Sequence, residues 1–93
     1  MSDPVFAPEG PLTMVSAPAL LEEGRRRARA GDLVVDFGRV GAADSAALAL
    51  LLDWMRCARA AGTRLSVRDL PAGMAALAAL YDIDPLLPLE SSK

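Results

Sequence analysis

The sequence predicts an α/β fold in which helices cover one face of a mixed, partly parallel β-sheet. Short strand-like runs alternate with longer helix-like runs along the chain, as is typical of parallel sheets with crossover helices. Of its 93 residues, 53% are hydrophobic and only 4% are aromatic, which favours helices on a modest sheet over an all-β design. A chain of this size can build one helical layer, so we expect residues 1–93 to form a single domain.

The first half of the chain predicts an edge strand, a helix and a buried strand. Residues 1–11 are rich in Pro and Gly, which limits them to a short edge strand near residues 5–7 and a turn. A helix follows Thr13–Ala17, tolerates Pro18 in its first turn and ends at Gly31. The run 33–37, Leu-Val-Val-Asp-Phe, is short and bounded by glycines, so it predicts a buried strand. We expect residues 38–44 to form a loop.

The second half predicts two more helices and one more strand. A long helix over residues 45–61 is closed by Gly62. The alternating run 64–68 predicts a strand with one covered face. A third helix over 72–81 is apolar nearly all round, and Asp84-Pro85 opens a short final turn or helix. Residues 89–93 are expected to be a polar tail.

Charge and composition exclude several classes of function. The formal net charge is −2, unlike the basic footprint of a nucleic-acid-binding protein. The basic run Arg25–Arg27 with Arg29 indicates either a solvated helix face or a contact with an acidic partner or lipid headgroups. The longest apolar run, 46–52, is far shorter than the roughly 20 residues that cross a bilayer. With a single cysteine, Cys57, we expect a cytoplasmic protein without an internal disulfide and without direct membrane insertion.

Catalytic chemistry has few candidate residues in this chain. The absence of histidine removes the commonest general base and metal ligand, and one cysteine without histidine excludes an ordinary structural zinc site. Neither GxxxxGK[ST] nor GxGxxG occurs. Two pairs of carboxylates, Asp36 with Asp44 and Asp82 with Asp84, lack the third ligand or phosphate loop that magnesium chemistry needs. We therefore expect no catalytic residue, no metal and no cofactor.

Ser45, at the start of the long helix, is the most informative polar residue. As a helix N-cap, its hydroxyl would accept a hydrogen bond from a backbone N–H. As a phosphorylation site, it would place new negative charge beside Asp44 at an exposed helix start, which would repel a partner that docks there. One serine can serve both roles.

The long helix carries a wider apolar arc than one sheet contact requires. One sector, suited to the sheet, consists of Leu48, Leu51, Leu52, Met55 and Ala58; an adjoining sector consists of Ala47, Leu50, Trp54, Cys57 and Ala61. Either a neighbouring helix covers the second sector or it is an exposed patch for a partner. Trp54 would anchor such a contact, and Cys57 is expected to be a small interface or core residue. The candidate partner-binding residues are Asp44, Ser45, Ala47, Leu50, Trp54 and Cys57.

The segment 33–48, Leu-Val-Val-Asp-Phe-Gly-Arg-Val-Gly-Ala-Ala-Asp-Ser-Ala-Ala-Leu, resembles the signature of STAS domains. In that signature a strand ending in Asp leads to Asp-Ser or Asp-Thr at a helix start. Residues 49–62 and 65–70 continue the likeness, and 77–88, with Leu-Tyr and a terminal Leu-Pro, is similar to the MlaB-like subfamily. The resemblance covers about residues 12–88. One departure is Ala47, which stands where the family usually has glycine.

The resemblance implies a non-catalytic cytoplasmic accessory subunit that binds the ATPase of a phospholipid-transporting ABC complex and serves outer-membrane lipid asymmetry. Leu50 and Trp54 would lie on the contact helix. Alternatively, the resemblance implies an anti-sigma-factor antagonist regulated by an anti-sigma-factor kinase through phosphorylation of Ser45. The domain could also self-associate when its partner is absent.

Overall fold

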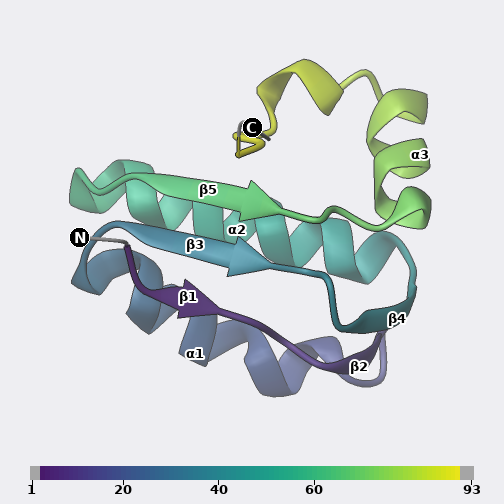
Figure 1. Ribbon diagram of the computed structural model, residues 1–93, viewed down its shortest axis with the longest axis horizontal. Helices are drawn as coiled ribbons and strands as arrows, with labels where there is room; N and C mark the ends of the chain where they lie inside the picture. Colours follow the sequence, from purple (N-terminus) through teal and green to yellow (C-terminus); the bar gives the residue numbers. More distant parts are fainter. Residues whose placement is uncertain (1–2, 91–93) are drawn as a thin grey trace.

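The computed structural model describes residues 3–90, and Figure 1 shows strands aligned in front of two long helices. The elements follow the chain in the order β1 (Val5–Phe6), β2 (Gly10–Leu12), α1 (Ala17–Ala30), β3 (Leu33–Asp36), β4 (Val40–Ala43), α2 (Ser45–Ala61), β5 (Leu65–Arg68), α3 (Ala72–Leu80) and the 3-10 helix η1 (Asp84–Leu86). The α/β class and the alternation expected from the sequence are confirmed.

The main sheet has three strands in the order β1-β3-β5. Its pairings are parallel, and Val35 at its centre aligns with Phe6 on one side and Val67 on the other. A parallel bridge between Val67 and Leu89 extends this sheet beyond β5. The segment 89–93, expected to be a polar tail, therefore begins with a residue that pairs with the sheet. Residues 91–93 of that segment, and residues 1–2, lie outside the described part.

β4 lies where the sequence predicts a loop, so that expectation is wrong for residues 40–43. The strand Val-Gly-Ala-Ala lacks the β-branched run that marks β3. It forms because β2 supplies a partner from the proline-rich N-terminal segment, with Gly10 beside Val40 and Leu12 beside Ala43. Since the pairing joins segments about thirty residues apart, no local pattern of side chains predicts it.

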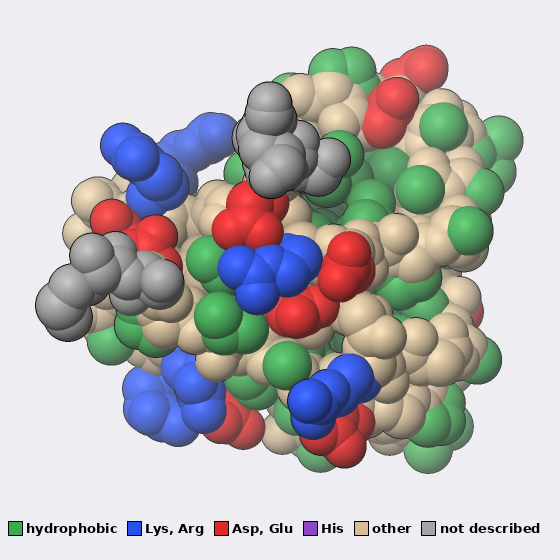
Figure 2. Space-filling model, in the orientation of Figure 1, with side chains coloured by type: hydrophobic (Ala, Val, Ile, Leu, Met, Phe, Trp, Pro, Cys, Tyr) green, Lys and Arg blue, Asp and Glu red, His purple; other side chains and the backbone are tan. Residues whose placement is uncertain are grey.

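The core lies between the main sheet and a layer formed by α1 and α2 (Figure 1). Its fully buried side chains include Leu12, Val35, Phe37, Leu51, Trp54, Val67 and Met74. The opposite face of the sheet is polar: Arg68 bonds to Glu90 at 2.7 Å and lies 3.9 Å from Asp36. Figure 2 shows acidic and basic side chains mixed over this face. The helices therefore cover one face, as expected.

α3 packs at the end of the sheet where the strands finish (Figure 1). Met74 and Ala78 are buried, whereas Leu80 is 72% and Tyr81 56% exposed. The domain thus does not bury all of this apolar helix. Among residues 3–90, no helix combines the length and the apolarity that crossing a bilayer requires.

Candidate functional site

The N-terminal end of α2 is organised by Asp44 and not by Ser45. Asp44 has extended backbone angles, and its Oδ1 accepts a hydrogen bond from the backbone N–H of Ala46 at 2.8 Å. Its Oδ2 accepts from the N–H of Met14 at 3.3 Å, and its own N–H donates to the carbonyl of Leu12 at 3.3 Å. Asp44 is therefore the N-cap, and it also ties the start of α2 to the segment before α1.

The expectation that Ser45 is the N-cap is wrong. Ser45 is the first residue of α2 and is exposed, and within residues 3–90 its hydroxyl has no hydrogen-bond partner. Asp and Ser are both good caps, so their order in the sequence does not decide between them; the backbone angles do. The Ser45 hydroxyl is thus free of any structural role that the described residues would give it.

Most of the second apolar sector of α2 is buried and is not an exposed patch for a partner. Ala47 and Trp54 are 0% exposed and Leu50 is 5% exposed. α1 covers Leu50 and Trp54, which is one of the two possibilities that the sequence left open. Trp54 Nε1 donates to the Leu21 carbonyl at 3.1 Å, and its indole lies where a side chain on Gly24 would be. Helix α1 of the same chain therefore provides both the packing surface and the hydrogen-bond acceptor for Trp54.

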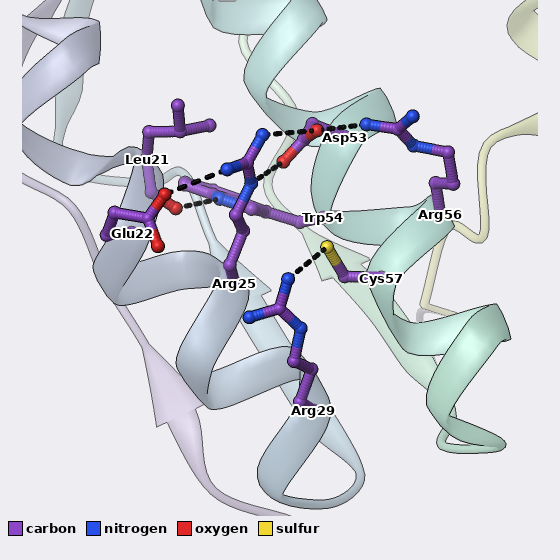
Figure 3. Close-up of polar contacts among 8 residues, drawn as sticks. All are labelled: Leu21, Glu22, Arg25, Arg29, Asp53, Trp54, Arg56 and Cys57. Atoms are coloured by element: carbon purple, nitrogen blue, oxygen red, sulfur yellow. Dashed lines mark hydrogen bonds and ion pairs between the residues drawn. The ribbon is translucent and has the colours of Figure 1, made fainter.

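A network of ion pairs bridges the outer edges of α1 and α2 (Figure 3). Arg25 donates to both carboxylate oxygens of Asp53, at 2.7 and 3.1 Å, and to Glu22 at 2.8 Å. Arg56 pairs with the same Asp53 from the far side. The hydrogen bond from Arg25, assisted by Arg56, lowers the pKa of Asp53 although partial burial opposes this. The carboxylate therefore stays charged and holds the two helices together.

Cys57 is partly buried beside Arg29, whose Nη2 lies 3.7 Å from Sγ. The sequence does not place any cation beside this thiol, because the two residues are 28 positions apart and meet only when α1 packs on α2. Figure 3 shows the Arg29 side chain reaching across the gap between the helices. Cys57 thus lies at the edge of the contact between α1 and α2.

An apolar hollow of about 270 Å³ opens near the start of α2. Its lining consists of Met14, Ala17, Pro18, Leu21, Ala46, Ala49 and Leu50. Met14 and Val15, in the segment before α1, are 75% and 91% exposed. The exposed apolar surface near Ser45 therefore comes from the segment before α1 and from the alanines of α2. It was missed from the sequence because Ala49 belongs to neither of the two apolar sectors of the long helix.

Of the carboxylates considered for acid–base or magnesium chemistry, Asp36 and Asp44 have structural partners. Asp36 accepts a hydrogen bond from the N–H of Gly38 at 2.8 Å, and Asp44 caps α2. Within residues 3–90, no cluster of three or more His, Cys, Asp or Glu side chains could hold a metal ion.

A family model described as "Mlab, STAS domain" matches residues 2–88 of the chain. The chain belongs to the STAS domain family. Among solved structures, this STAS domain is similar to one titled "Structure of the Anti-Sigma Factor Antagonist SpoIIAA in its Unphosphorylated Form", with a TM-score of 0.72 and 15% identity. The match covers 95% of this chain and 79% of the other, and at that identity it shows the fold alone. No curated protein matches the chain.

In this STAS domain the Asp44-Ser45 pair stands at the helix start that the sequence signature indicates, between the carboxyl end of β4 and the first turn of α2. The Asp44 side chain accepts hydrogen bonds from the backbone N–H groups of Ala46 and Met14, whereas Ser45 is exposed. Ala47, at the position usually held by glycine, is fully buried. The exposed part of this helix start is therefore Ser45 with the apolar hollow beside it.

Proposed function

We propose that this STAS domain is a non-catalytic, cytoplasmic accessory subunit that docks on the ATPase of a phospholipid-transporting ABC complex. In that assembly it would be peripheral to the inner membrane and would help to maintain outer-membrane lipid asymmetry. The observation that carries the proposal is the exposed start of α2, where the uncommitted Ser45 hydroxyl lies next to an apolar hollow. The MlaB-type family match supports an ATPase as the partner.

The candidate residues take different parts in this docking. Ser45 and the rim of the hollow would contact the ATPase directly, and Asp44 would hold the rim in place through its bond to Met14. The buried residues of the set, Ala47, Leu50 and Trp54, would support that surface from within the core without contacting the ATPase. A charge at Leu50 or Trp54 would therefore unfold the domain and would not report on docking.

The proposal is tested by co-expression with the ATPase and affinity purification. Ala49→Glu places a carboxylate on the exposed wall of the hollow without filling a buried site. The wild type should co-purify with the ATPase, and Ala49→Glu should lose binding at least about tenfold, about 1.4 kcal/mol. Circular dichroism should show that it stays folded, because surface changes of this kind alter stability by only about 0.5 kcal/mol.

Ala76→Glu is the matched control, because Ala76 is an exposed alanine on α3, outside the hollow. It should bind the ATPase as the wild type does. Equal binding by the two variants would remove the start of α2 from the interface. Failure of the wild type to bind the ATPase would refute the proposed function itself.

An anti-sigma-factor antagonist regulated through Ser45 is the second candidate. The exposed hydroxyl without a partner in the described structure favours it, because a kinase can reach it and no cap would be lost. Incubation with a partner-switching kinase should then add the mass of one phosphate to the wild type and none to Ser45→Ala. An unchanged mass of the wild type would count against this function.

A further inference from the structure

We propose that the groove between α1 and α2 binds a helical segment of a partner protein that carries apolar side chains in one half and carboxylates in the other. This inference rests on the proposed docking function and specifies the chemistry of the docking segment. The two helices run side by side behind the sheet (Figure 1). Two hollows lie along their contact, one lined by Ala46 and Ala49 of α2 and the other by Cys57, and the two hollows together are called the groove.

The end of the groove near Ser45 is apolar. The hollow there has a floor at Leu50, which is 5% exposed, and walls at Pro18 and Ala49. Because the wall residues of α2 are alanines, the hollow of about 270 Å³ has room for a large apolar side chain such as Leu or Phe. Burial of such a side chain contributes about 1.5–3 kcal/mol. This end therefore selects an apolar anchor.

The opposite end of the groove is basic. A second hollow, of about 410 Å³, is lined by Arg25, Arg29, Arg56, Cys57 and Ala60. Asp53 and Glu22 are the carboxylates that pair with these arginines, so three guanidinium groups face two carboxylates and one positive charge is left unbalanced.

Arg29 is the arginine with unused capacity. In the described structure its guanidinium contacts the Cys57 sulfur and makes no ion pair with a carboxylate. Arg56 is 75% exposed and bonds to Asp53 through one nitrogen. A guanidinium donates two parallel hydrogen bonds to a carboxylate, so Arg29 and Arg56 can each bind a carboxylate of a partner. This end selects an acidic segment.

The spacing of the two ends defines the partner. Ala46 and Cys57 are eleven positions apart on α2, which is about 16 Å along a helix. A partner helix laid in the groove would need its apolar anchor and its carboxylates separated by about three turns. The α1–α2 contact between the two hollows is tightly packed, because the Trp54 ring lies against Gly24. Arg25 is also bound to Asp53 there (Figure 3). The two hollows are therefore held at a fixed spacing before a partner binds.

The test uses labelled synthetic peptides about 16 residues long. One carries Leu residues in one half and Glu residues in the other, and its twin replaces every Glu with Lys. In fluorescence anisotropy, the Glu peptide should bind the wild type at least about tenfold more tightly than the Lys peptide. Arg29→Glu should weaken binding of the Glu peptide by about tenfold.

Arg64→Glu is the matched control, because Arg64 is exposed, lies outside the groove and makes no carboxylate pair among the described residues. It should change peptide affinity by less than about twofold. Equal effects of the two reversals, equal binding of the twins, or no binding of the Glu peptide would overturn the inference. The inference would also be overturned if no peptide binds and the wild type instead binds vesicles of phosphatidylcholine with phosphatidylglycerol, with that binding lost in Arg29→Glu.

The outcome is separable from that of the proposed function. If the wild type binds the ATPase and Arg29→Glu retains that binding as fully as Arg64→Glu does, docking stands and the groove is not its site. If the wild type fails to bind the ATPase but binds the Glu peptide with the expected dependence on Arg29, the groove inference stands and the partner is another protein.

Discussion

Two neighbouring flanks of α2 meet α1 in opposite ways. At Trp54 the contact is closed: the indole is fully buried, fills the space above Gly24 and donates its N–H to α1. Little more than one turn earlier, at Ala49, the surface is open and lines a hollow. A small residue is needed at both places: Gly24 leaves space for the Trp54 ring, and Ala49 leaves space for a side chain of another molecule. A wide apolar arc is therefore weak support for a docking surface, because another helix of the same chain can cover most of it.

The closed flank is tested most strongly by Trp54→Ala. The change removes the largest core side chain, its contact with Phe6 at 5.6 Å between ring centroids, and its hydrogen bond to α1. We expect the free energy of unfolding to fall by about 3–5 kcal/mol in urea denaturation. A loss below about 1 kcal/mol would show that α1 does not pack on α2 in this way.

Gly24→Ala probes the same contact from the other helix. An added Cβ would overlap Cε2 of Trp54, so the ring or the helix must move. We expect the free energy of unfolding to fall by about 1–3 kcal/mol. Gly41→Ala is the control, because its Cβ would meet no atom within 4 Å. Thermal denaturation that ranks the two variants equally would contradict the close approach.

At the open end, Asp44→Ala and Ser45→Ala separate the cap from its exposed neighbour. Asp44→Ala removes the bond to the Ala46 N–H and the tie to Met14. The free energy of unfolding should fall by about 1 kcal/mol, and the Ser45→Ala variant should match the wild type within about 0.5 kcal/mol. The reverse order would return the capping role to Ser45.

The ion pairs that join the two flanks predict a dependence on pH. Because Arg25 and Arg56 lower the pKa of Asp53 below the usual 3.8, the folded state holds this carboxylate charged more readily than the unfolded state does. The resulting stabilisation is present above pH 3.8 and is lost as the pH falls through the lowered pKa. Thermal melts from pH 6 to pH 2.5 should show a shallower acid-side loss of stability for Asp53→Asn than for the wild type. Parallel curves would mean that the pair contributes nothing.

The chain's local patterns were sufficient for most of the fold. Helix α2 begins and ends where the sequence predicts, and Gly62 closes it with a left-handed backbone at φ 75°. Strand β3 is found within the predicted run, one residue shorter. β4 was missed because its small side chains carry no strand signal and its partner β2 is remote in the sequence.

The candidate site was less predictable because it too depends on contacts between residues that are remote in the sequence. The pair Asp44-Ser45 could be placed at a helix start from sequence, whereas the choice of cap depended on backbone angles. The burial of Leu50 and Trp54 followed from where α1 packs, not from their spacing.

By itself the sequence determined the class of fold, the order of the main elements and the helix start that bears Ser45. These depend on periodicity, glycines and capping residues, which act over a few neighbouring positions. Only the tertiary structure decided that Trp54 bonds to Leu21, that Arg29 reaches Cys57 and that Met14 is held by Asp44. Each of these contacts joins residues 28 to 33 positions apart, so it exists only once the helices have packed on the sheet.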